Sequence, residues 1–225
     1  MSATTLDAAG PVSGVADDAH AAGATSIEQA LAALPEPVRR YPWRPGFTGM
    51  WVGISLEFFE FSVFFAVYFT TRALNPQAFH EGAQRLWATV GLGITMVMVT
   101  SGYFLTRTVD AVRRGQQAAA RRWIVAALVT ALGYPLLKFF EVGWNQAHGL
   151  RAHADVFVTV YYYLTINHLV HASWGIMGMA WVTARLFMGT YRSDDLRGLE
   201  TLAVYWHATD IVWLMLFTFF YAFTG

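Results

Sequence analysis

The chain contains no cysteine, and only 13% of its 225 residues are charged. The missing cysteine excludes disulfide bonds, thiolate metal sites and cysteine nucleophiles. A soluble domain of this length needs a more highly charged surface, whereas 56% of these residues are hydrophobic. The formal net charge is zero, so overall charge points to neither nucleic acid nor an acidic partner. The composition therefore indicates a membrane protein.

Several signatures of enzymes are missing as well. The sequence has no glycine-rich phosphate loop and no Ser, His and Asp in a recognisable motif context. The apolar stretches contain three histidines, His168, His171 and His207, which are too few for a multi-haem or dinuclear copper site. We therefore expect no catalytic set in this chain.

The first 46 residues differ in composition from the rest of the chain. They are rich in Ala, Gly, Ser and Asp, and they lack the basic start and apolar core of a secretory signal peptide. This composition predicts a disordered cytoplasmic tail over residues 1–46, with one short helix at SIEQALAAL that begins after Ser26. The remaining residues, 47–225, form the expected membrane domain.

Five continuous apolar stretches are long enough to cross a bilayer core, which takes about 20 helical residues. They cover roughly residues 48–71, 87–109, 122–144, 156–187 and 202–223. Continuous runs favour helices over strands, whose apolar residues alternate. Pro135 is the only proline within a span and predicts a local kink. We expect an all-α integral membrane bundle of five transmembrane helices.

The arginines predict the orientation of this bundle. With the N-terminus in the cytoplasm, eleven arginines fall on the cytoplasmic side: Arg39, Arg40, Arg44, Arg107, Arg113, Arg114, Arg121, Arg122, Arg185, Arg192 and Arg197. The other side has three, Arg72, Arg85 and Arg151. Because cytoplasmic loops carry the excess of basic residues, we expect the N-terminus inside and the C-terminus outside.

Ionisable residues occur within these stretches, although each costs about 2.5–3.5 kcal/mol at the centre of a membrane helix. Such residues should face protein, water or each other. The sequence predicts a buried polar cluster drawn from Glu57, Glu60, His168, His171, Glu200, His207 and Asp210. Glu57 and Asp210 each lie about nine residues, or about 14 Å, from the cytoplasmic ends of their helices. We expect these two residues to meet His171 and His207 in the cytoplasmic half of the bundle.

Two pairs of intramembrane polar residues can be explained by helix packing alone. Lys138 and Glu141 are three residues apart and are expected to form an ion pair near the outer interface. The spacing of His168 and His171 suits two metal ligands, but without a third ligand a hydrogen-bonded helix contact is favoured.

Other polar and aromatic residues also have structural explanations. Glu57 and His207 together can act as a purely structural clasp between helices. Glu200 can be a first-turn residue that the helix dipole favours. The aromatic runs 161–163 and 217–221 are expected to be ordinary lipid or interface packing.

Four segments resemble subunit III of the haem-copper oxidases, and together they span roughly residues 48–223. ETLAVYWHATDIVWLMLFTFFY is similar to the last helix of that family at Glu200, Tyr205, Trp206, His207, Asp210, Val212 and Trp213. LTINHLVHASWG resembles its histidine segment at Thr165, His168, His171 and Gly175, while Ile166 and Ala172 depart from the usual Gly and Val. Glu141 in LLKFFEV and Glu57 in MWVGISLEFFEF resemble further family carboxylates, with Glu60 one turn from Glu57.

The resemblance implies a non-catalytic accessory subunit of a bacterial respiratory haem-copper complex in the inner membrane. The resemblance implies that such a subunit has no metal and no cofactor of its own. It stabilises the catalytic subunit, which holds the haem and copper, and can assist proton uptake or gas access. The resemblance also implies contact with other subunits and with bound phospholipid. The family form with seven helices has two that this chain lacks. The short form is similar to the branch associated with nitric oxide reductases, so both that enzyme and a terminal oxidase are candidate complexes.

Two other functions are compatible with the polar residues. A proton-coupled transporter or channel would use Glu57, Glu60, His207 and Asp210 as a relay, although the inverted repeats and broken helices common in transporters do not occur in the sequence. An integral-membrane metalloenzyme would use the three intramembrane histidines as metal ligands.

Overall fold

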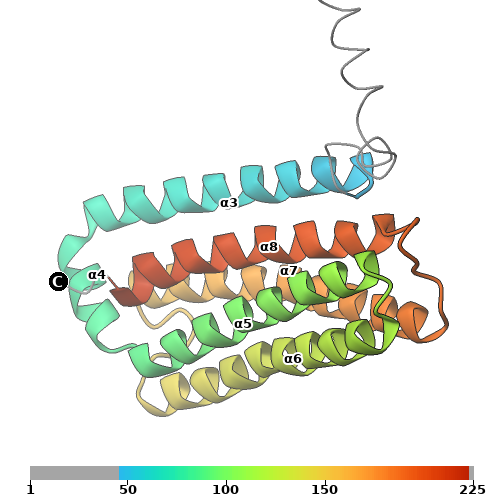
Figure 1. The fold of residues 1–225 in the computed structure, drawn as a ribbon. Coiled ribbons are helices and arrows are strands. Elements are labelled where there is room, and N and C mark those ends of the chain that lie inside the picture. The colour runs from blue at the N-terminus through green and yellow to red at the C-terminus, as the bar shows by residue number, and fades with distance from the viewer. Residues whose placement is uncertain (1–45, 223–225) are drawn as a thin grey trace, which may run out of the picture. The chain divides into compact units, whose positions relative to one another are not determined.

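The computed structural model describes residues 46–222, and these residues form an all-helical bundle (Figure 1). The expected tail and its short helix lie outside the described residues. The elements are α3 (Thr48–Leu74), α4 (Pro76–Gln84), α5 (Ala88–Arg113), α6 (Gln117–Ala147), α7 (Val156–Phe187), α8 (Arg197–Phe217) and the π-helical turn η1 (Thr218–Ala222). The described residues contain no strand, only an isolated bridge between Arg192 and Asp195.

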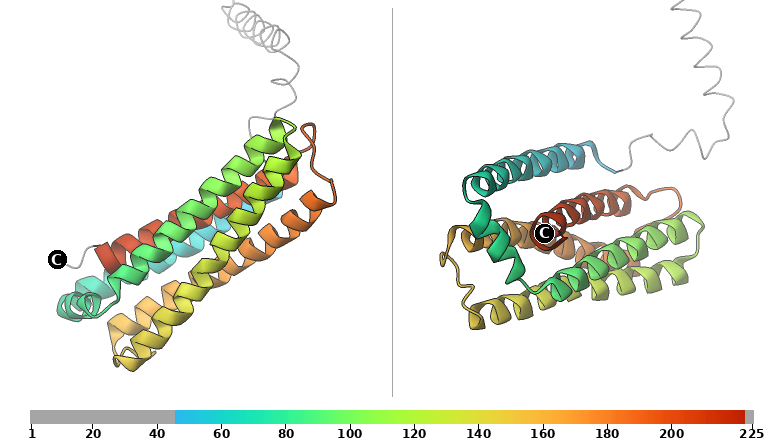
Figure 2. Two further views of the ribbon diagram at one scale, coloured as in Figure 1. Left: turned by 60° about the horizontal axis from the view of Figure 1, so that its bottom comes forward. Right: turned by 90° about the vertical axis from the view of Figure 1, so that its left-hand side faces the viewer.

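The five long helices run along one another, and each runs opposite to the one before it (Figure 1). Helix α8 contacts α3, α5 and α7, and the two views of Figure 2 show it in the middle of the bundle. Helices α5 and α6 form the most extensive contact, and the Ser101 hydroxyl donates to the Ala127 carbonyl across it at 2.9 Å. The short helix α4 closes one end, where Phe79 contacts the rings of Tyr68 and Phe157.

The helices extend beyond the apolar stretches that predict them. The span expected over 122–144 belongs to a helix from Gln117 to Ala147, and that expected over 202–223 begins at Arg197. Backbone hydrogen bonding continues past the hydrocarbon boundary, so hydropathy alone places helix ends too far inward. Pro135 lies inside α6, which continues through it.

Glycines end two of these helices. Gly115 follows α5 with a φ of 71°, and Gly189 follows α7 with a φ of 77°. Both allow the next residue to bond back to the helix, Gln116 N–H to the Ala111 carbonyl and Thr190 N–H to the Arg185 carbonyl. A left-handed glycine just past the last turn is the usual way to end a helix, because it lacks a Cβ.

Four helices in the described residues are long and apolar enough to cross a membrane. They are Thr48–Leu74, Ala88–Arg113, Gln117–Ala147 and Arg197–Ala222. The expected fifth span, α7, has 32 residues but is not among the four. Its first half contains three consecutive tyrosines, Asn167 and two histidines, which lower its hydropathy. The all-helical membrane architecture is confirmed, whereas the count of five spans and the orientation remain predictions.

Candidate functional site

The polar residues of the bundle form separate groups and not the single cluster that the sequence predicted. Glu57 faces His171 on α7, while His207 faces α5 and Asp210. In the described residues no contact joins Glu57 to His207, so the expected clasp between them is wrong. Two members are also more exposed than expected, because the side chains of Glu60 and His207 are 42% and 45% accessible.

The first group, which we call the His171 site, holds one imidazole between two carboxylates of α3. Nδ1 of His171 lies 3.3 Å from Oε1 of Glu57, and Nε2 lies 3.5 Å from Oε2 of Glu60. The two glutamates are three residues apart, which places them on one helix face. Glu57 is buried at 4% exposure, so the site reaches from the bundle interior at Glu57 to the surface at Glu60.

The surroundings of the His171 site hold its components in place. Tyr205 on α8 donates to the His171 carbonyl at 3.0 Å, and the ring of Phe61 meets the imidazole edge-on at 5.4 Å. Neither carboxylate oxygen of Glu57 has a hydrogen bond within the described residues. A buried carboxylate in that position is stabilised by a charged imidazole or by a proton of its own.

His168 does not belong to the His171 site although it is only one helical turn away. It is fully buried, its Nε2 lies 3.2 Å from the Thr209 carbonyl, and its Nδ1 lies 2.9 Å from the Tyr134 hydroxyl. The carbonyl can only accept, so Nε2 carries the hydrogen and Nδ1 accepts from Tyr134. The geometry is that of a hydrogen-bonded helix contact, and the described residues contain no group of His, Asp and Glu suited to a metal.

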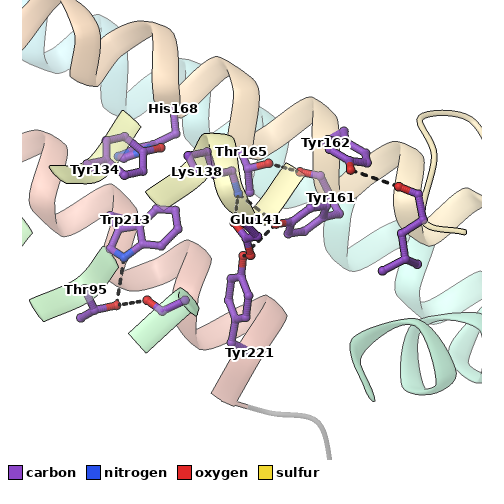
Figure 3. Close-up of polar contacts among 12 residues, drawn as sticks. Thr95, Tyr134, Lys138, Glu141, Tyr161, Tyr162, Thr165, His168, Trp213 and Tyr221 are labelled. Atoms are coloured by element: carbon purple, nitrogen blue, oxygen red, sulfur yellow. Dashed lines mark hydrogen bonds and ion pairs between the residues drawn. The ribbon is translucent and has the colours of Figure 1, made fainter. Parts of the chain in front are cut away.

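A second group surrounds Lys138 and Glu141, which form an ion pair at 2.8 Å with side chains 1% and 0% exposed (Figure 3). Lys138 also donates to the Tyr161 hydroxyl at 2.9 Å. Tyr221 donates to Glu141, and its oxygen lies 2.8 Å from that of Tyr161. The four residues connect α6, α7 and η1 in a closed hydrogen-bond network.

The expectation that the aromatic runs are ordinary packing is therefore wrong for two of their members. Tyr161 and Tyr221 are buried, and their hydroxyls complete the shell of a buried ion pair. The signal available in the sequence was the choice of Tyr over Phe in apolar runs near a charged pair, because a buried tyrosine hydroxyl needs a partner.

The third group consists of His207 and Asp210 on α8 against α5. Nδ1 of His207 lies 3.6 Å from Oδ2 of Asp210, and its Nε2 lies 3.1 Å from the Thr106 hydroxyl. Gly102 makes room for the pair, because a Cβ there would lie 2.6 Å from Oδ2 of Asp210. Glu200 is separate again: it pairs with Arg113 at 2.8 Å and ties the start of α8 to the end of α5.

An apolar groove runs beside the His171 site, between α3, α7 and α8. It has a volume of about 340 Å³, and its lining includes Gly175, Gly178 and the exposed Trp174 and Trp181. Tyr205, which bonds to the His171 backbone, also lines it. The groove is large enough for several methylene groups or a small apolar gas molecule.

Asp155, outside the apolar part of the bundle, caps α7 by accepting from Val158 N–H at 2.8 Å and pairs with Arg85 at 2.7 Å. Partial burial pushes the pKa of Asp155 upward, but the hydrogen bonds from Arg85 and Val158 outweigh it and the pKa lies below its ordinary value. A lowered pKa means that this stabilisation is present above the unfolded-state value of about 3.9 and is lost as pH falls through the folded-state value.

We therefore expect Asp155→Ala to lower the free energy of unfolding at neutral pH by about 1 kcal/mol, chiefly through the lost cap. Asp155→Asn can still cap the helix and loses only a partly exposed ion pair, so it should cost less. Unfolding by denaturant at pH 7 and again below pH 4 would measure this. A wild type and alanine variant that differ equally at both pH values would contradict it.

Comparison with known proteins finds one protein family that matches the whole described region. The family described as cytochrome c oxidase subunit III matches residues 44–225. The probable cytochrome c oxidase subunit 3 of Mycobacterium leprae is 29% identical over 174 residues, covering 77% of this chain and 85% of the relative. The cytochrome c oxidase subunit 3 of Corynebacterium diphtheriae is 27% identical over 175 residues, again covering 77% of this chain and 85% of the relative. The heme-copper oxidase subunit I+III of Aeropyrum pernix is 27% identical over 183 residues, covering 77% of this chain and 22% of that relative.

Proposed function

Because the chain belongs to the cytochrome c oxidase subunit III family, we propose that it is a non-catalytic accessory subunit of a bacterial respiratory haem-copper complex. The observation that carries this proposal is the family match over residues 44–225, which includes every polar group of the bundle. The protein is a multi-pass membrane protein with at least four apolar helices. In the proposal α7 is a fifth span, the N-terminus is cytoplasmic and the membrane is the bacterial inner membrane.

The proposed partner is the catalytic subunit, which would hold the haem and copper. The name of the Aeropyrum pernix relative joins subunits I and III, and this supports assembly of a domain like the present one with a subunit I. The Mycobacterium leprae and Corynebacterium diphtheriae relatives, of which 85% is matched, are named for cytochrome c oxidase. These names favour a terminal oxidase over a nitric oxide reductase as the complex.

Within the complex, the His171 site is proposed to exchange protons. On the way inward from the surface, a proton would meet the half-exposed carboxylate of Glu60, then the imidazole of His171 and last the buried carboxylate of Glu57. The adjacent groove is proposed to admit an apolar gas or the tail of a phospholipid.

Purification of the tagged chain from its native membrane in mild detergent tests the proposal. We expect a large subunit to co-purify and the eluate to show a haem absorption spectrum, whose haem types distinguish an oxidase from a nitric oxide reductase. A colourless preparation without a partner would contradict the proposal. Proton flux from that preparation in liposomes would then support the transporter.

A double-mutant cycle tests the assignment of partners in the His171 site. Glu57→Gln and His171→Asn should show non-additive effects on the free energy of unfolding, of about 0.5–3 kcal/mol, because the two side chains are in contact. Glu57→Gln and His207→Asn should be additive within about 0.5 kcal/mol, because His207 faces α5. Coupling of Glu57 to His207 and not to His171 would overturn the assignment.

A further inference from the structure

A small pocket lies at the end of the bundle that α4 closes, where α3 ends and α7 begins (Figure 1). We call it the Arg72 pocket, and it has a volume of about 150 Å³. Its lining combines two basic side chains and four aromatic rings: Arg72, His80, Tyr68, Phe79, Phe157 and Phe219. The apolar groove beside the His171 site is a separate feature, because it is lined by Met50 at the opposite end of α3.

Hydrogen bonds and ring contacts fix the walls of this pocket. The Tyr68 hydroxyl donates to the Phe219 carbonyl at 2.7 Å, and the two rings stack with their centroids 5.4 Å apart. The Phe79 ring meets that of Phe157 edge-on at 5.4 Å, and both side chains are at most 3% exposed. The Arg72 pocket is therefore preformed, and binding there costs little conformational entropy.

Arg72 brings a cation to the pocket from the last turn of α3. Its Nη1 donates to the Tyr68 hydroxyl at 3.2 Å. No carboxylate of the described residues pairs with this half-buried guanidinium, so its other N–H groups remain for a ligand. The helix dipole favours a cation in a last turn, which explains the charge but supplies no acceptor for those N–H groups.

His80 on α4 provides a second donor. Its Nε2 lies 3.0 Å from the amide nitrogen of Gln84, which can only donate, so Nε2 accepts and Nδ1 of the neutral ring carries the hydrogen. The carboxylates next to the lining residues in sequence have other partners. Gln77 donates to Glu81 at 2.9 Å, and Arg85 pairs with Asp155 at 2.7 Å. The pocket therefore presents donors and a positive charge to a ligand.

Arginines are scarce on this side of the chain, which the sequence predicts to be the outer side. The described residues there include three: Arg72, Arg85 and Arg151. Arg85 pairs with Asp155, and Arg151 is an exposed loop residue that does not line the pocket. Because basic residues favour the cytoplasmic side of a membrane protein, an arginine kept in an outer pocket points to a specific partner.

The groups in the pocket suit a phosphate. The planar guanidinium can donate to two phosphate oxygens at once, and Nδ1–H of His80 can donate to a third. The aromatic walls lower the local dielectric constant and strengthen such bonds. The volume admits a phosphate group but not a whole phospholipid, whose acyl chains would have to lie outside the pocket.

We propose that the Arg72 pocket binds a phosphate group through the guanidinium of Arg72 and the imidazole of His80. The phosphate can come from two sources, inorganic phosphate in the outer aqueous phase or the headgroup of a phospholipid whose tails lie along the bundle. The pocket is formed within one chain, so this site does not depend on the partner subunit of the proposed function.

Melting temperatures of the delipidated full chain in a neutral detergent test the proposal. The chain is titrated with sodium phosphate in one series and with dihexanoylphosphatidylglycerol in another, while sodium chloride keeps the ionic strength constant. A ligand that binds only the folded protein raises the melting temperature. We expect Arg72→Gln to raise the concentration needed for a given shift by about tenfold, and His80→Ala by about threefold. Arg151→Gln, the matched outer arginine, should leave it unchanged.

The two series identify the source of the phosphate. A shift with inorganic phosphate supports a site for the free anion, and a shift confined to phosphatidylglycerol supports a headgroup site. Dihexanoylglycerol lacks the phosphate and should have no effect. A shift with it equal to that with phosphatidylglycerol would show that only the acyl chains bind, and would overturn the proposal.

Two further results would also overturn it: no shift with either phosphate compound, or equal titrations of the wild type and both pocket variants. Arg72→Gln also loses the bond to Tyr68 and can therefore be less stable without any ligand. His80 is exposed, so His80→Ala decides the test should Arg72→Gln fail to fold.

Discussion

Replacing Lys138 by methionine is expected to lower the free energy of unfolding by about 3–5 kcal/mol, a large part of the stability of a helical bundle. Lys138 is the cation of a fully buried ion pair, and both side chains are 1% exposed or less. Without it, Glu141 keeps the hydrogen bond from Tyr221 but loses its countercharge in the bundle interior. Titration of the detergent-solubilised protein with sodium dodecyl sulfate, followed by circular dichroism, would measure the loss.

Two control variants test whether the loss of stability comes from leaving one buried charge unpaired. Arg114→Met breaks an exposed ion pair with Asp110, whose side chains are 60% and 37% accessible, and should cost less than about 1 kcal/mol. Lys138→Met combined with Glu141→Leu removes both buried charges and should recover most of the loss, because Tyr161 and Tyr221 can still bond to each other. A Lys138→Met variant that is no less stable than Arg114→Met would contradict the account of the buried network.

Gly175→Ala is the second substitution with a large expected effect. A Cβ at this position would lie 2.8 Å from Cε3 of the fully buried Trp206 and 3.2 Å from Cε1 of Tyr205. Helix α8 must move away or the indole must leave its rotamer, at a cost of about 1–3 kcal/mol. Because the Tyr205 hydroxyl holds the His171 backbone, the same shift should disturb the His171 site.

Gly53→Ala is the matched control, since nothing lies within 4 Å of the Cβ it would add on α3. Alanine favours a helix interior over glycine by about 0.5–1 kcal/mol, so this variant should be unchanged or slightly more stable. The same detergent titration applied to both variants gives the comparison. Equal effects at the two positions would show that the contact with Trp206 does not set the requirement for glycine.

The long helices could be predicted from the sequence because each contains an apolar run long enough to cross a bilayer. Helix α4 could not, since PQAFHEGAQ is short and contains no continuous apolar run, and it is held by the burial of Phe79 against other helices. For α7 the sequence predicts a long helix, which the structure contains, but its tyrosines, histidines and Asn167 keep it out of the four helices apolar enough to cross a membrane.

Which polar residues share a face could be predicted, but which helix that face meets could not. Three-residue spacing places Glu57 beside Glu60 whatever the partner. The partner depends on the rotation of each helix about its axis, and small residues decide that rotation here. Gly102 lets α5 approach the side of α8 that carries His207 and Asp210, so these two side chains turn away from Glu57. The expected cluster failed because close packing at one glycine outweighs a favourable meeting of charges.

The spacing within the buried network also bears on how the chain enters the membrane. Tyr221 follows Glu141 by 80 residues, so at about 5–20 residues per second the ribosome makes it roughly 4–16 s later. During that interval α6 carries its lysine and glutamate without Tyr221. These two charges lie three residues apart and can neutralise each other within the single helix. Helix α6 can therefore be inserted as a nearly neutral segment, and the tyrosines of α7 and η1 complete the shell when the later helices arrive.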